Sequence, residues 1–289
     1  MIAIILVNYN GLNDTIECIE SIKKSTYDDY KIIVVENASD DIEIIQQNEY
    51  IKTNADLIIL RENLGFSGGN NEGILFAKER YNPDYYFLLN NDTVIEKFTI
   101  NYMLKAFDKY DRVGIVTCRI PYYKKRNYLW NGEGSFDDKL GIADQPYMGK
   151  KSTEDEYECI VNFASGCAML ISKDVVKDVG VLSEKYFMYA EDTDYCCRVR
   201  KANYNIVYTN NGIVYHKVSA STGEDSDFQI YYMFRNNCII IKQYSVYPIL
   251  GYIKLWYRMI KNDRLKNHRK IVIKAWKDFR NGINGKVEI

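Results

Sequence analysis

The sequence has few of the residues that divide a chain into separate units. Only 4 of its 289 residues are proline, no stretch rich in proline, glycine and serine interrupts it, and it contains no internal repeat. Hydrophobic residues make up 47% and charged residues 27%, a balance typical of a globular chain and not of a disordered one. The length suits one large α/β domain, or a catalytic domain with an appendage.

Long apolar runs are missing as well. No run of about 18 uncharged apolar residues is present, so no helix is predicted to span a membrane. Residues 2–7 already have the pattern of a strand, so no signal peptide is predicted ahead of them. The seven cysteines are irregularly spaced, and the adjacent Cys196 and Cys197 suit neither a CxxC zinc site nor a disulfide framework. We therefore expect free thiols in a cytoplasmic protein.

Two common nucleotide-binding loops are also absent. The glycine-rich segment 64–71 does not have the G-x-G-x-x-G spacing of a dinucleotide site, which would also follow the first strand. No Gly-Lys-Ser/Thr sequence of a Walker loop occurs. These absences argue against a dehydrogenase or an NTPase. As the entry to a helix, the segment still offers backbone N–H groups that suit a phosphate.

What is present is a series of short apolar segments that end in polar residues. Such runs are typical of strands buried on both faces of a parallel sheet, and helical segments separate them. We predict an α/β fold with an open, mostly parallel, doubly wound sheet, whose ligands bind beyond the carboxyl ends of the strands. The predicted strands are residues 2–7, 31–35, 57–60 and 85–89.

Capping and turn residues predict the other boundaries. Asn13 or Asp14 is the expected cap of the first helix, and segment 68–71 is expected to open a helix that runs toward Arg80. The pattern predicts one strand over residues 160–171 and one or two over residues 205–218. From Phe228 onward the pattern is helical.

The segment Asn90-Asn91-Asp92 follows the last of the four strands. If it is extended, Asn90 and Asp92 point to the same side and offer two oxygen ligands to one divalent cation. Mg²⁺ or Mn²⁺ needs only one or two oxygen ligands from a protein when diphosphate oxygens complete its coordination. The alternative is an ordinary Asn/Asp turn.

Three acidic residues gather in Glu191-Asp192-Thr193-Asp194. Crowded carboxylates have a raised proton affinity, which suits a general base. The alternative is a solvated helix N-terminus, where acidic side chains favour the helix dipole. His216 is one of only two histidines, and a lone histidine is more often structural than a ligand.

Together these segments resemble the family 2 glycosyltransferases of the GT-A fold, in particular their rhamnosyltransferase-like branch. The match covers about residues 2–220 and is ordered along the chain. Two positions depart from the family pattern, because Glu36 and Asn90 replace aspartates. The matching segments are Val7-Asn8-Tyr9-Asn10, Val35-Glu36-Asn37-Ala38-Ser39, Asn63-Leu64-Gly65-Phe66-Ser67-Gly68-Gly69-Asn70, Asn90-Asn91-Asp92, Glu191-Asp192 with Asp194 and Arg198, and His216.

The resemblance implies a metal-dependent, inverting hexosyltransferase. A sugar would pass from an NDP-sugar, with dTDP-rhamnose favoured, to a hydroxyl of a polysaccharide or lipid-linked acceptor. Asp92, with His216 and Asn90, would hold Mg²⁺ or Mn²⁺ on the donor diphosphate. Asp192 would take the proton from the acceptor hydroxyl, and Glu191 is the alternative base.

The resemblance also implies roles for residues around these groups. Gly166, Asp194 and Arg198 would lie on the acceptor side. The donor side would be formed by Asn8, Asn10, Glu36, Asn37, Arg61, Asn63, Gly65, Gly69, Asn70, Asn90 and Asn91.

The end of the chain differs in charge from the rest. From Lys242 onward there are 12 lysines and arginines but only 3 acidic residues. We divide the chain into a catalytic domain, residues 1–225, with a nucleotide-sugar half (1–112) and an acceptor half (113–225), and a basic helical extension, residues 226–289. Aromatic residues beside lysine and arginine favour a helix at the inner membrane surface, so the expected location is cytoplasmic and peripheral. Packing on the domain or a homodimer contact is the alternative, and a nucleic-acid partner is not expected.

Two other functions fit parts of the pattern. An NDP-sugar nucleotidyltransferase would need basic residues in a glycine-rich loop after the first strand, where Asn8-Tyr9-Asn10-Gly11 stands. A glycan- or nucleotide-binding module would not need the acidic groups that the chain keeps.

Overall fold

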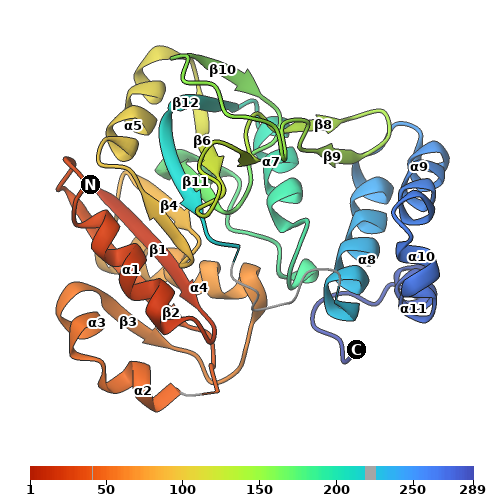
Figure 1. The fold of residues 1–289 in the computed structure, drawn as a ribbon, viewed down its shortest axis with the longest axis horizontal. Coiled ribbons are helices and arrows are strands. Elements are labelled where there is room, and N and C mark those ends of the chain that lie inside the picture. Colours follow the sequence, from red (N-terminus) through yellow and green to blue (C-terminus); the bar gives the residue numbers. More distant parts are fainter. Residues whose placement is uncertain (41, 219–225) are drawn as a thin grey trace.

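The computed structural model describes residues 1–40, 42–218 and 226–289. Figure 1 shows a body built on one large sheet, with the C-terminal helices gathered beside it. The strands follow the order β10-β12-β6-β11-β4-β1-β2-β3. The predicted boundary between residues 225 and 226 falls at the end of a segment that lies outside the described residues.

The N-terminal half forms the four parallel strands that the sequence predicts. In the register, Ile4 of the central strand lies between Ile32 and Phe87. Alternate side chains of a strand point to opposite faces, so Ile4 packs in the core on one side and Ile5 in the core on the other. The elements are β1 (Ile2–Asn8), α1 (Leu12–Ile22), β2 (Tyr30–Glu36), α2 (Ile42–Gln47), α3 (Glu49–Asn54), β3 (Asp56–Ile59), α4 (Gly65–Arg80) and β4 (Tyr85–Leu89).

Both predicted helix starts in this half were wrong. Helix α1 begins at Leu12, and Gly11 is its N-cap residue, so neither Asn13 nor Asp14 caps it. Helix α4 begins at Gly65, three residues before the expected start. Its N-cap residue is Leu64, and the side chain of Asn63, one residue earlier, accepts a hydrogen bond from the Gly65 N–H at 2.8 Å, which satisfies the first N–H group of the helix.

The second half adds antiparallel strands to the sheet. Strand β11 runs antiparallel to both of its neighbours, β4 and β6, whereas β12 is parallel to β6. The elements are β5 (Thr93–Ile95), α5 (Thr99–Lys109), β6 (Val113–Pro121), β7 (Leu129–Asn131), β8 (Ser135–Asp137), β9 (Ile142–Asp144), β10 (Glu158–Val161), β11 (Ala168–Ser172), α6 (Lys173–Asp178), the 3-10 turn η1 (Glu184–Tyr186), α7 (Glu191–Lys201) and β12 (Asn205–His216).

The prediction of one strand over residues 160–171 was wrong. Two strands, β10 and β11, occupy its ends, and they pair with different neighbours. The turn Ser165-Gly166-Cys167 lies between them, where Cys167 N–H donates to the Ser165 hydroxyl. A glycine in such a segment signals a break in the strand.

The C-terminal helices share a core with the catalytic half. Phe187, which precedes α7, packs in one cluster with Tyr232 and Phe234 of α8. Ile240 of the same helix belongs to the core under α4 and α7. No helix among residues 1–40, 42–218 and 226–289 is both long and apolar enough to cross a membrane. These helices are α8 (Asp227–Tyr244), α9 (Pro248–Lys261), α10 (Arg264–Asn267) and α11 (Arg269–Arg280).

Candidate active site

Asp92 and His216 meet where the two halves of the sheet join. Antiparallel pairing of β5 with β12 sets Thr93 opposite His216. As a result, Asp92 Oδ1 lies 3.1 Å from His216 Nε2, and both side chains are buried. The ring of Trp130 stands edge-on to the imidazole, with ring centroids 4.2 Å apart. His216 Nδ1 is buried and has no hydrogen-bond partner among the described residues.

The reasoning that led from the sequence to this site was partly wrong. Residues 90–92 form a turn and not an extended segment, so strand alternation does not set Asn90 and Asp92 on one side. Asn90 acts in the turn through its backbone, which donates to Cys167 O and accepts from the Thr93 hydroxyl. Asp92 nevertheless lies at the carboxyl end of β4, where the sheet topology predicts a ligand site.

The donor atoms of Asp92 and His216 fit a divalent cation with few protein ligands. In the described part of the chain, no group of three or more histidine, cysteine or acidic residues is placed so that it could hold a metal ion by itself. A carboxylate and an imidazole suffice for Mg²⁺ or Mn²⁺ when a nucleotide diphosphate supplies other oxygens. The unpartnered ring nitrogen of a buried histidine is also unusual unless the histidine has a further role.

The two candidate bases begin α7 but lie in different surroundings. Asp192 is half-buried, and its carboxylate accepts hydrogen bonds from the N–H of Gly166 at 3.1 Å and of Thr193 at 2.7 Å. Glu191 is only 6% exposed, and its Oε2 has no hydrogen-bond partner in the described structure. Burial raises the pKa of Asp192. Burial, together with the charge of Asp192, raises the pKa of Glu191 well above its usual range.

The turn that holds Asp192 lies at the same edge of the sheet as Asp92. Cys167, which follows Gly166, accepts a hydrogen bond from the Asn90 N–H at 2.9 Å. A Cβ atom on Gly166 would lie 2.9 Å from the Phe66 ring, so a side chain here would displace that ring. The start of β11, the end of β4 and the first turn of α7 therefore converge.

One set of the predicted donor-side residues shapes the strand ends. Glu36 is fully buried, and its carboxylate accepts hydrogen bonds from Asn8 Nδ2 and the Ser39 N–H. Asn10 donates through its N–H to the Ser39 hydroxyl at 2.8 Å. Asn91 donates to Thr15 at 2.9 Å. These bonds fix the loops after β1, β2 and β4 against one another.

A second set of donor-side residues fixes the start of α4. Asn37 Oδ1 accepts from the Leu64 N–H, and its amide donates to Asn63 Oδ1 and Gly65 O. Asn70 donates to Phe66 O within the helix. A Cβ atom on Gly69 would lie 2.8 Å from Val7 Cγ1, so this glycine permits close packing on β1. Arg61 is exposed just before this segment.

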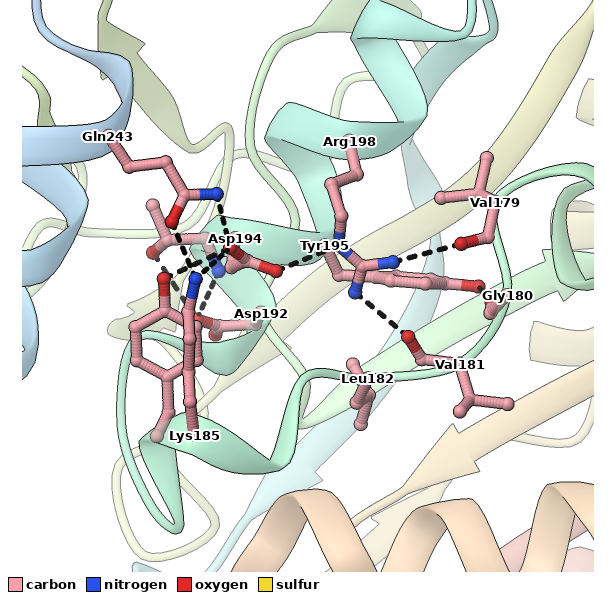
Figure 2. A network of polar contacts seen from close by, with 12 residues as sticks. Val179, Gly180, Val181, Leu182, Lys185, Asp192, Asp194, Tyr195, Arg198 and Gln243 are labelled. Atoms are coloured by element: carbon pink, nitrogen blue, oxygen red, sulfur yellow. Dashed lines mark hydrogen bonds and ion pairs between the residues drawn. The ribbon is translucent and has the colours of Figure 1, made fainter. Parts of the chain in front are cut away.

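Asp194 and Arg198 lie in a buried polar network (Figure 2). Asp194 is 1% exposed, and Arg198 Nε donates to its Oδ2 at 2.8 Å. Arg198 also donates to the carbonyls of Val179 and Val181. The carboxylate is thus engaged inside the protein, and its expected place on the acceptor side stays a prediction. Its other partners are Tyr186, Tyr244, Gln243 and Lys185.

Sequence reasoning missed two residues that support the site. Lys217 follows His216, and its Nζ lies 2.7 Å from Asp14 and 2.6 Å from Glu17, which ties the end of β12 to α1. Trp130 lies in β7, outside the segments singled out from the sequence. In the sequence, the only signal for Lys217 was its position next to the predicted His216. No sequence signal marked Trp130.

The chain matches the family model described as glycosyl transferase family 2 over residues 3–180. It is 28% identical over 256 residues to the low-salt glycan biosynthesis hexosyltransferase Agl10 of Haloferax volcanii, covering 81% of this chain and 73% of that protein. It is 25% identical over 154 residues to the rhamnosyltransferase WbbL of Escherichia coli, covering 50% of this chain and 57% of that protein.

Solved structures share the fold at low identity. The structure of GalNAc-T7 with UDP, GalNAc and Mn²⁺ superposes with a TM-score of 0.67 at 12% identity, covering 84% of this chain and 47% of that one. The mannosyltransferase PcManGT of Pyrobaculum calidifontis, in complex with GDP-Man and Mn²⁺, gives 0.58 at 12% identity, with 84% and 63% covered. Both support the predicted fold class.

Glu191→Gln should stabilise the protein at pH 8 but not at pH 4. The raised pKa of Glu191 means that ionisation is harder in the folded chain than in the unfolded one. The wild type therefore loses stability as pH rises above the unfolded pKa of about 4.3, whereas glutamine does not ionise. Melting temperatures at both pH values test this, with the exposed Glu72→Gln as control. An equal fall in melting temperature at both pH values would show that Glu191 does not act as a buried carboxyl.

Proposed function

The chain belongs to glycosyl transferase family 2 and is a glycosyltransferase of the GT-A fold, and on that premise we propose that it transfers a sugar from an NDP-sugar to an acceptor hydroxyl with inversion. The observation that carries the proposal is the convergence of two groups at one sheet edge. The Asp92–His216 pair comes from β4 and β12, and Asp192 is held by the turn before β11.

The Asp92–His216 pair would hold the divalent cation of the donor complex. When bound, Mg²⁺ or Mn²⁺ would offset the negative charge that develops on the departing diphosphate. The backbone around Asn37, Asn63 and Gly65 would shape the nucleotide side of the site. Relatives of known structure were solved with UDP or GDP-Man and Mn²⁺, which supports this class of donor.

Asp192 is the better candidate for the base that takes the acceptor proton. It is half-buried and accepts two backbone hydrogen bonds, which favour its ionised form. Glu191 is more deeply buried and lacks a partner for Oε2, so its proton is retained more strongly. In such a pair the less basic carboxylate ionises first and the other stays neutral. Gly166, whose N–H binds Asp192, would lie on the acceptor side.

Rhamnose is the favoured sugar, and a lipid-linked or polysaccharide hydroxyl is the favoured acceptor. A 65-residue segment is 38% identical to an N-acetylglucosaminyl-diphospho-decaprenol L-rhamnosyltransferase of Mycobacterium tuberculosis, covering 22% of this chain and 21% of that protein. The longer match to WbbL has the same sugar in its name. An acceptor of this kind lies at a membrane surface.

Helix α9 presents an apolar stripe that suits such a surface. Ile249, Ile253, Tyr257 and Ile260 are each more than half exposed and follow one another at helical spacing. The opposite face, with Leu255 and Met259, is buried in the core shared with α8. Because basic residues dominate the chain from Lys242 onward, the partner that complements this stripe is an anionic lipid bilayer.

Asp192→Asn should abolish sugar transfer while nucleotide binding persists. Loss of a general base lowers turnover by about 10²–10⁴-fold. Transfer from dTDP-rhamnose, UDP- and GDP-sugars would be measured together with thermal shifts for dTDP, UDP and GDP with Mn²⁺. The exposed Asp108→Asn is the control. Wild-type turnover in Asp192→Asn would contradict the assignment. Nucleotide binding with no transfer by the wild type to any acceptor would favour a binding module.

Ile249→Asp with Ile253→Asp should weaken binding to phosphatidylglycerol vesicles. Full burial of one isoleucine is worth about 1.5–3 kcal/mol, so the partition constant should fall at least about tenfold. The matched control is Ile44→Asp with Leu75→Asp, two exposed apolar residues on α2 and α4. Unchanged vesicle binding, with a dimer converted to monomers in sedimentation, would show that the stripe is a contact between copies.

A further inference from the structure

The backbone just before the two candidate bases is strained. Phe187, Tyr189 and Ala190 all have positive φ, at 60°, 67° and 71°, a region that residues other than glycine rarely adopt. At Phe187, ψ is −57°, and the Met188 N–H donates to Tyr186 O at 2.7 Å. This is the γ-turn of positive φ, which is rare. Such a segment keeps its shape only if its surroundings hold it.

One amide group of α8 holds most of this segment. Asn236 Nδ2 lies 2.9 Å from Tyr186 O and 2.8 Å from both Met188 O and Tyr189 O. Arg235 Nε donates to Asn236 Oδ1 at 3.0 Å, which turns the NH₂ group toward the three carbonyls. Both side chains are fully buried. Figure 1 shows α8 beside the segment that leads into α7.

A further carbonyl of the strained segment, that of Phe187, is held from the donor side. Phe187 O accepts a hydrogen bond from the Phe66 N–H at 2.8 Å. A Cβ atom on Gly65 would lie 2.1 Å from the same oxygen, so the start of α4 and the segment are in close contact. The segment is therefore fixed between α4 and α8, and α7 starts directly after it.

We propose that Asn236 is a positioning residue for the transfer reaction: by holding residues 186–190 it sets the first turn of α7, and so the direction of the Asp192 carboxylate toward the Gly166 turn. This inference rests on the proposed function. Asn236 itself is fully buried in α8, so it would act through residues 186–190 and not on the substrates directly. The C-terminal helices would thus have two roles. Helix α9 exposes an apolar stripe, and α8 supports the active site through Asn236.

The test compares Asn236→Ala with Asn237→Ala. Asn237 is the adjacent residue, but its amide donates only to Met233 O of its own helix. In Asn236→Ala we expect kcat to fall at least about 30-fold while the Kd for dTDP or UDP with Mn²⁺ changes less than threefold. Hydrogen exchange at residues 187–192 should accelerate at least tenfold. Asn237→Ala should leave all three unchanged. If Asn236→Ala does not fold, Asn236→Ser, which keeps a hydroxyl donor, is measured in its place.

Two results would overturn the inference. A folded variant with faster exchange at residues 187–192 but unchanged kcat would show that the segment does not direct Asp192. Equal losses in kcat and nucleotide affinity would show that it serves the donor site. A wild-type chain that binds nucleotide without transferring sugar would overturn the proposed function instead. The exchange measurement would then still decide whether Asn236 holds the segment.

Discussion

The antiparallel pairing of β5 with β12 brings Asp92 beside His216, and the rest of the site is arranged around that contact. Asp92 follows the last strand of the parallel half, whereas His216 ends the last strand of the second half. Strand β11, inserted antiparallel between β4 and β6, brings the Gly166 turn to the same edge. A sheet that was parallel throughout would place the start of β11 at the far end of the molecule. The mixed topology thus explains how Asp192 comes near Asp92.

Two acidic residues of α7 are buried in different surroundings. Asp194 is buried with Arg198, Lys185 and two tyrosines, so its charge is compensated and its role is to hold the α7 region together. Glu191 is also buried, and burial together with the charge of Asp192 raises the pKa of its carboxyl, with no ion pair to offset this among the described residues. A protein keeps such an uncompensated group at a cost in stability, which is typical of functional sites.

The four parallel strands were predictable because each depends on a local pattern, whereas the roles of Asp92, Asp192 and His216 rest on the family resemblance and stay predictions. Apolar runs signal strands buried on both faces, and the polar residues after them must gather at one sheet edge. The network around Asp194 was not predictable, because Tyr244 and Gln243 reach it from a helix some fifty residues later. The strained segment 187–190 was missed because tertiary contacts, and not its own sequence, hold it. The early start of α4 was missed because the glycines at positions 68 and 69 were taken as the helix entry, whereas Asn63 binds the N–H of Gly65, the first helical residue.

The central claim is that Asp92 and His216 form a cation site completed by a nucleotide diphosphate. Electron paramagnetic resonance of Mn²⁺, titrated with protein in the presence of dTDP, UDP or GDP, tests it without any assay of transfer. The account predicts that one nucleotide makes the protein remove the free Mn²⁺ signal, and that Asp92→Asn and His216→Ala each weaken Mn²⁺ binding at least about tenfold. The same Mn²⁺ affinity in wild type and both variants would contradict it.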